Sequence, residues 1–279
     1  KRKIPFVKKI KFDDDAFFLM TIEEIADFSK KYKELINLPL RITGATPSTL
    51  HKEKLRLLVD AGLREIRMGI QTAGAETKKL YKRPHTNQQV ESAVRMVFNE
   101  KQVEGKYDII LDSPWDTKPD TIQTLMFLSK LPAPYVLTLF SLVLFPGTDL
   151  YRKGKEEGII KDDVNDIYRK HYHGCKSTYL NSLYFLLKDY VGIGSGLISQ
   201  KLMSILTNEK FNFLHKPIVI FLRGLFPLVK INYLILNMGF KKTIYRLITN
   251  PRIKKILTKL IGSFKTSDKK KELILKENI

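Results

Sequence analysis

Strand-like segments alternate with helix-like segments from residue 4 to residue 145, and this alternation constrains the fold of the chain more than any other feature. Five short segments have the length and apolar content of strands, and each but the last is followed by a helical pattern. The predicted strands span residues 8–12, 40–43, 65–70, 107–111 and 135–144. Because strands connected through helices run parallel with right-handed crossovers, we predict an α/β fold, either a β/α barrel or a doubly wound sheet.

The predicted helices carry recognisable end signals. Thr21 precedes a helix with acidic residues in its first turn, where a hydroxyl caps the helix and negative charge favours its dipole. Gly62 ends the helix predicted over residues 50–60. Two further helices are predicted over residues 87–100 and 118–130. No GxGxxG or P-loop pattern follows the first strand, which disfavours a nucleotide-binding doubly wound sheet.

The chain changes character after residue 148, and we divide it into a β/α region, residues 1–160, and a basic helical region, residues 161–279. The net charge of +20 is concentrated near the C-terminus, where residues 181–279 contain 18 Lys and Arg against 5 Asp and Glu. A positive field of this kind attracts the phosphate groups of lipids or nucleic acids. Strand motifs that interleave aromatic and basic residues do not occur, so we do not expect nucleic acid as a partner.

Two segments of the basic region, residues 217–229 and 231–240, are strongly apolar and are flanked by lysines. They are interpreted either as helices that lie on an anionic membrane surface or as a helical cap on the barrel. No run of 18 uncharged apolar residues occurs, so the sequence does not predict a transmembrane helix. A single cysteine, Cys175, excludes internal disulfides and fits a reducing compartment. We therefore expect a cytoplasmic protein, with peripheral membrane association as an extension of that expectation.

Polar side chains follow the predicted strands at their carboxyl ends, where a β/α barrel has its active site. An acidic run, Asp13-Asp14-Asp15, follows the first strand. Gln71 and Thr72 follow the third strand, and Asp112 follows the fourth. Carboxylates at this edge can accept hydrogen bonds from a ligand ammonium group, and the guanidinium group of Arg83, on the helix after the third strand, can bind a carboxylate at two points.

These patterns, taken in order, resemble radical S-adenosylmethionine (SAM) enzymes, in the branch that often carries an N-terminal cobalamin-binding domain. The resemblance covers residues 8–160 and rests on five motifs. Phe12-x-Asp14-Asp15-x-Phe17 resembles the end of the family's second strand, and Gly69-x-Gln71-Thr72 resembles a GxQS motif with Thr in place of Ser. The others are the arginine motif at Arg83, the segment 107–117 with Asp116 in place of Glu, and the turn Pro146-Gly147-Thr148.

The resemblance implies a partial (β/α) TIM-like barrel, the radical SAM core strands 2–6, followed by an α-helical C-terminal region. It implies that Asp14 and Asp15 accept from the SAM ammonium group, that Gln71 and Thr72 offer side chains to SAM, and that Arg83 pairs with the SAM carboxylate. Asp112 is expected to reach the ribose or a substrate hydroxyl. The alternatives are structural: turn and capping acids, loop hydrogen bonds and a surface arginine.

The same resemblance implies cofactors that the chain does not hold by itself. Radical SAM enzymes bind a [4Fe–4S] cluster on three closely spaced cysteines and use it to cleave SAM into a 5′-deoxyadenosyl radical. With Cys175 alone, we expect the cluster ligands to lie upstream of residue 1, together with any cobalamin-binding domain, and the present chain to be inactive by itself. An electron donor and a small-molecule or lipid-like substrate are the implied partners.

Three other interpretations stay open at this point. Another β/α-barrel lyase or isomerase would need a catalytic lysine or phosphate loop at a strand end, whereas Lys118 and Lys130 lie on a predicted helix. A basic membrane-surface protein built on a barrel remnant would need no catalysis. The pattern His171-x-His173-x-Cys175 lacks the usual zinc spacing and a fourth ligand, so no metal site is predicted in this chain.

Overall fold

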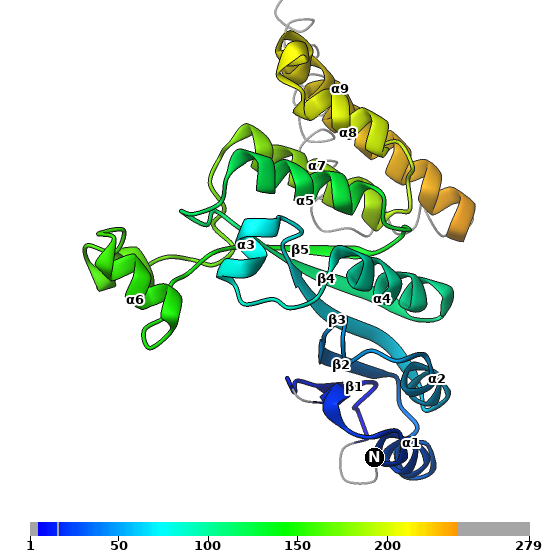
Figure 1. Ribbon diagram of the computed structural model, residues 1–279. Coiled ribbons are helices and arrows are strands. Elements are labelled where there is room, and N and C mark those ends of the chain that lie inside the picture. The colour runs from blue at the N-terminus through cyan, green and yellow to red at the C-terminus, as the bar shows by residue number, and fades with distance from the viewer. Residues whose placement is uncertain (1–4, 16, 239–279) are drawn as a thin grey trace, which may run out of the picture. The chain divides into compact units, whose positions relative to one another are not determined.

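The computed structural model describes residues 5–15 and 17–238. Its centre is a parallel sheet of five strands in the order β1-β2-β3-β4-β5, so strands adjacent in sequence are adjacent in space (Figure 1). The prediction of a parallel α/β fold is therefore confirmed. The strands are β1 (Ile10–Phe12), β2 (Leu40–Ala45), β3 (Leu63–Gln71), β4 (Glu104–Leu111) and β5 (Val136–Ser141).

Helices connect the strands as predicted, and their buried faces pack against the sheet. The predicted cap at Thr21 is a full capping box, because its side chain accepts from the Glu24 amide and the Glu24 carboxylate accepts from the Thr21 amide. Thr86 forms the same arrangement with Gln89. The connecting helices are α1 (Ile22–Leu35), α2 (Lys52–Asp60), the short α3 (Ala75–Leu80), α4 (Asn87–Asn99) and α5 (Lys118–Ser129), with a 3-10 turn η1 (Phe17–Leu19) before α1.

The two faces of the sheet differ sharply, because successive side chains of a strand point to opposite faces. In β3 the apolar residues Ile66, Met68 and Ile70 are fully buried against the helices, whereas Arg67 and Gln71, on the other face, are half-buried. The neighbouring strands repeat this pattern. The second face, called the polar face below, carries Lys11, Asp13, Arg41, Thr43, Glu65, Arg67, Lys106 and Asp108.

The predicted fifth strand, residues 135–144, is too long. β5 ends at Ser141, and Leu142 and Leu144 instead join Ile160 and Ile167 in a small separate core cluster. An apolar run thus continues past the strand because it packs against the following loop and helices. These helices are α6 (Asp149–Glu156) and a π-helical turn η2 (Val164–Tyr168).

The later helices begin with α7 (Tyr179–Gly192), which packs on β5 and α5, and α8 (Gln200–Thr207), which packs on α5. A 3-10 turn η3 (Glu209–Phe211) then leads into α9 (Asn212–Met238). The chain forms two compact units, Lys1–Arg223 and Gly224–Ile279. Helices α7 and α8 thus belong to the unit of the sheet, and the division drawn at residue 160 stays a prediction.

The prediction of two separate apolar segments is wrong for the part that the structure describes, because α9 continues without a break through Lys230. The end of the second segment, at residue 240, lies outside the described residues. Within the helical stretch Glu209–Asn237, an 18-residue window has a mean hydropathy of 1.8, so by length and composition this stretch is able to cross a membrane. The sequence prediction missed this possibility because it required a run with no charge at all.

Candidate functional site

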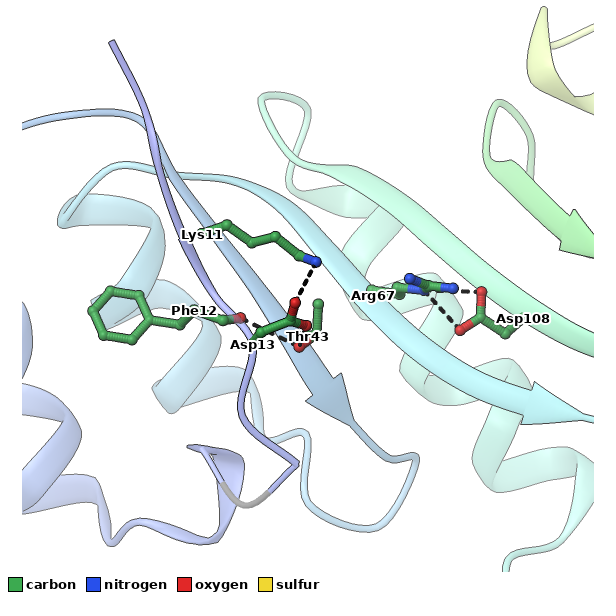
Figure 2. A network of polar contacts seen from close by, with 6 residues as sticks. All are labelled: Lys11, Phe12, Asp13, Thr43, Arg67 and Asp108. Carbon is green, nitrogen blue, oxygen red and sulfur yellow. Dashed lines mark hydrogen bonds and ion pairs between the residues drawn. The ribbon is translucent and has the colours of Figure 1, made fainter. Parts of the chain in front are cut away.

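A cleft of about 460 Å³ lies on the polar face at the carboxyl ends of the first strands. Its walls come from the loop after β1, the end of β2, the end of β3 and the residues that follow α3. Figure 2 shows part of its polar network, with residues from β1, β2, β3 and β4. The residues that line the cleft are Asp13, Asp15, Thr43, Gly44, Ala45, Thr46, Arg67, Gly69, Gln71, Arg83 and Asp108.

Three of the predicted site residues, Asp15, Gln71 and Arg83, meet in this cleft although they are far apart in sequence. Gln71 ends β3 with a positive φ of 66°, a left-handed conformation that marks the irregular end of the strand. A Cβ atom on Gly69 would lie 2.5 Å from Gln71 Nε2, so the glycine leaves room for the glutamine side chain to fold back over the strand. The Gly-x-Gln spacing therefore has a steric cause.

The acidic loop sits directly against the end of β2, and Gly44 permits this approach. Gly44 has a φ of +77°, and a Cβ atom there would lie 2.1 Å from the Asp14 carbonyl oxygen and 2.7 Å from Asp15 Cα. Only glycine fits such a contact. Of the two predicted acids, Asp15 lines the cleft, while Asp14 contributes this backbone packing, and a role for its side chain toward SAM stays a prediction.

Asp13 is a site residue that the motif comparison missed. Its carboxylate accepts from Lys11 Nζ at 2.7 Å and from Thr43 Oγ1 at 2.9 Å, as Figure 2 shows. These two bonds lower the pKa of the Asp13 carboxyl, with Lys11 as the larger cause, so it is held ionised in the cleft. The alternation Lys11-x-Asp13 places both residues on one strand face, and this was the available signal.

The floor of the cleft holds a second ion pair that sequence reasoning also missed. Arg67 Nε donates to both Asp108 oxygens, at 3.0 and 2.8 Å, and the guanidinium lies 5.5 Å from the centre of the Phe140 ring. Burial raises the pKa of Asp108, and the hydrogen bonds and charge of Arg67 oppose that rise. Charged residues inside predicted strands are easily taken for solvent-exposed positions, which explains the omission.

Arg83 was predicted on the helix after the third strand, but it lies beyond that helix, because α3 ends at Leu80, and the turn at this end holds it at the cleft. Lys82 adopts a positive φ of 52°, and the Arg83 amide donates to the Lys78 carbonyl at 2.9 Å, which closes the helix as a left-handed C-terminal cap. Within the part of the chain that the structure describes, the buried Nε atom of Arg83 has no hydrogen-bond acceptor. A buried N–H group without a partner is costly, so this guanidinium fits a site for an anionic ligand group.

Thr72 and Asp112 lie outside the cleft. The Thr72 hydroxyl is buried, lies 3.1 Å from Thr124 Oγ1 and accepts from the Gly74 amide at 3.1 Å. It therefore forms hydrogen bonds that stabilise the loop, which is the structural alternative given above. The Asp112 carboxylate accepts from Asn181 Nδ2 at 2.7 Å and from the Lys176 amide at 2.9 Å, and so ties the start of α7 to the end of β4. Their contacts with SAM stay predictions.

The histidine and cysteine cluster after β5 is an aromatic packing arrangement in this structure. The His173 ring stacks on Phe140 with centroids 5.1 Å apart, and the His173 amide donates to His171 Nδ1 at 3.2 Å. Burial raises the pKa of the Cys175 thiol, which disfavours the thiolate that binds metals. Over residues 5–15 and 17–238, no group of three His, Cys, Asp or Glu side chains is arranged to hold a metal ion.

The lysines considered for barrel chemistry do not face the cleft. Lys118 forms an ion pair with Glu209, and Lys130 forms one with Glu91 at 2.7 Å. Both lie at the ends of α5, as predicted.

Comparison with known proteins finds a family profile that matches part of the chain. Residues 11–125 match the profile described as the Radical SAM superfamily. No curated protein matches the chain.

Solved structures with similar folds include coproporphyrinogen III oxidase (HemN) from Escherichia coli, a radical SAM enzyme. It is 17% identical, with 50% of this chain and 33% of that chain covered and a TM-score of 0.45. The radical SAM methyltransferase TsrM from Kitasatospora setae, solved with cobalamin and a [4Fe–4S] cluster, is 19% identical, with 54% and 31% covered and a TM-score of 0.45. The cobalamin-dependent SAM radical enzyme OxsB is 16% identical, with 94% and 39% covered and a TM-score of 0.43. The chain thus covers less than half the length of each of these three structures.

Proposed function

Because residues 11–125 match the profile of the Radical SAM superfamily, we propose that the cleft on the polar face binds SAM for a radical enzyme. The observation that carries this proposal is the buried Arg83 Nε without an acceptor among the described residues, in a cleft that also holds Asp13 and Asp15. The amino-acid end of SAM carries one carboxylate and one ammonium group. Besides the Arg67–Asp108 pair, the cleft holds one guanidinium and two carboxylates, and this set is complementary to that pair of charges.

Each residue has a separate part in this proposal. Arg83 would hold the SAM carboxylate through its guanidinium fork, which a lysine would not reproduce. Asp13 and Asp15 would accept from the ammonium group, and the low pKa of Asp13 keeps its acceptor charge over the physiological range. Gln71, folded over Gly69, would offer its amide to the same ligand.

The iron–sulfur cluster of the family does not fit the residues of this chain. Cys175 is its single cysteine, and burial disfavours the thiolate form of that residue. In this superfamily a reduced [4Fe–4S] cluster cleaves SAM to a 5′-deoxyadenosyl radical, which is the chemistry that the bound groups supply. We therefore propose for this chain the SAM-binding part only, with the cluster, the electron donor, the small-molecule substrate and any cobalamin contacted by other residues.

SAM binding by the full 279-residue chain tests the proposal, measured by isothermal titration calorimetry. Arg83→Lys should raise the Kd for SAM about tenfold, which corresponds to about 1.4 kcal/mol, because a lysine cannot bind the carboxylate at two points. The matched control is Arg95→Lys, because Arg95 pairs with Glu91 on the surface of α4 at 2.8 Å. Equal affinity of the wild type and the Arg83→Lys variant for SAM would reject this assignment of the cleft.

A further inference from the structure

Helix α9 has an unusual distribution of charge for a long apolar helix. Lys216, Arg223 and Lys230 are spaced seven residues apart, and α9 contains no Asp or Glu. Seven residues make nearly two full turns, so the three cations form one stripe along the helix, the basic stripe below. A stripe of cations without acids is suited to anionic partners.

A broad apolar surface lies beside the basic stripe. Phe213, Ile220 and Phe221 in the first half of α9, and Leu228 and Leu236 in the second half, keep between 64% and 77% of their surface exposed. Single exposed apolar residues are normal on a protein surface, but five large ones along one helix mark an interaction surface.

The remaining face of the first half of α9 is anchored to the folded domain. The His215 ring stacks on Tyr179 with centroids 5.0 Å apart, and His215 Nε2 lies 3.1 Å from the Ile205 carbonyl oxygen. The Tyr190 hydroxyl donates to the Leu222 carbonyl at 2.6 Å, and Leu222 is buried. The first half of α9, held by its side in this way, is placed to lie along a membrane surface.

The sequence around α9 identifies the charge of the partner. Residues 210–267 contain twelve Lys and Arg and no Asp or Glu. A second copy of the chain would bring equal positive charges together, which disfavours a symmetric pair through this face. Nucleic acid would satisfy the cations but would leave the large apolar residues exposed. An anionic lipid surface satisfies both, since its phosphates meet the lysines and its acyl boundary accepts the apolar side chains.

We propose that α9 binds the surface of an anionic phospholipid bilayer, with Phe213, Ile220 and Phe221 entering the headgroup boundary and the basic stripe lying at the phosphates. The proposal rests on α9 and not on the SAM cleft, so each can fail without the other. Binding of this kind would hold the chain close to membrane-dissolved molecules.

Flotation of the full chain with lipid vesicles tests the proposal. Binding to vesicles of phosphatidylcholine mixed with phosphatidylserine should exceed binding to phosphatidylcholine alone and should weaken as salt screens the phosphates. The triple change Phe213→Ser, Ile220→Ser and Phe221→Ser should reduce binding at least about tenfold, because it removes the apolar side chains that enter the lipid. The change Lys216→Gln, Arg223→Gln and Lys230→Gln should remove the preference for phosphatidylserine.

Matched controls separate this surface from general charge and hydrophobicity. Lys33→Gln, Arg56→Gln and Lys101→Gln remove the same charge from exposed positions elsewhere, and Phe145→Ser removes an exposed aromatic ring outside α9. Both controls should bind as the wild type does, with circular dichroism confirming the fold of every variant. Three results would overturn the proposal: equal loss in the controls, a dimer that the apolar triple variant abolishes without vesicle binding, or retention in membranes after alkaline carbonate extraction, which would indicate a spanning helix.

Discussion

At the scale of single residues, the polar face of the sheet is stabilised by pairing charges across the strand register. Arg67 with Asp108, and Arg41 with Glu65 at 3.0 Å, cross between neighbouring strands, and Lys106 reaches Glu65 at 3.0 Å. A buried charge without a partner is strongly destabilising, so these cross-strand pairs are what permits a charged sheet face. Arg83 differs, because its buried Nε atom has no acceptor in the described part of the chain, which suits a ligand group as its partner.

His85, two residues beyond Arg83, leads to a prediction about pH. Burial lowers the pKa of His85, and the charges of Lys78 and Arg83 lower it further. A histidine with a depressed pKa in the folded state contributes stability above the pKa of about 6.5 that it has when unfolded, and this stability is lost as the pH falls through the folded value. Urea unfolding midpoints should therefore decrease as the pH is lowered from about 7.5 to about 5, because the unfolded state then binds a proton at His85 that the folded state does not.

The variant His85→Phe removes that titration, so its unfolding midpoint should depend less on pH than that of the wild type. The slope with pH is the readout, because the substitution also changes packing. His51→Phe is the matched control, since His51 is exposed, and it should keep the slope of the wild type. If His85→Phe keeps that slope too, the buried histidine does not contribute to acid sensitivity.

At the scale of elements, the end of β2 decides where the acidic loop lies. Gly44→Ala should be strongly destabilising and should weaken SAM binding. The new Cβ atom would collide with the Asp14 backbone, and the alanine would have to keep a left-handed φ. Gly147→Ala is the matched control: Gly147 has a φ of +87°, but a Cβ atom there would have no described neighbour within 4 Å. The Gly147→Ala substitution therefore measures only the cost of a left-handed φ for alanine, about 1–2 kcal/mol.

The measurement is the free energy of unfolding in urea for both variants, with SAM titration of each. Gly44→Ala should lose at least about 2 kcal/mol more than Gly147→Ala, since the new Cβ atom collides with backbone at Gly44 and has no described neighbour within 4 Å at Gly147. Equal losses would show that the loop after β1 can move away from β2. The cleft wall formed by Asp15 would then be adjustable and would not fix the position of that carboxylate.

The elements also explain what the sequence could and could not predict. The alternation of parallel strands with helices and the helix start at Thr21 followed from periodicity and caps, because these depend on local chemistry. The end of β5 at Ser141 was missed, since Leu142 and Leu144 are apolar for a different reason, packing on Ile160. Gln71 and Arg83 were found through motif order, whereas the Arg67–Asp108 pair depends on strand register, which single-residue patterns do not encode.

At the scale of the whole molecule, this chain combines the cleft proposed to bind SAM with a single cysteine. Anaerobic addition of iron and sulfide to the full chain should give no stable [4Fe–4S] absorbance, because cluster binding in this family needs three closely spaced cysteine thiolates. Cys175→Ser should give the same spectrum as the wild type. Any weak absorbance that both proteins share reflects iron sulfide bound without specific ligands.

The contrary result, a stable cluster that Cys175→Ser removes, would show that Cys175 binds the cluster with ligands other than the family's cysteines. The SAM titration distinguishes the remaining cases. SAM binding without a cluster means that the cleft alone recognises the charged end of SAM through Arg83 and the acids of the β1 loop. If the folded chain forms no cluster and binds no SAM, the similarity over residues 11–125 reflects a shared fold without the family's cofactor binding.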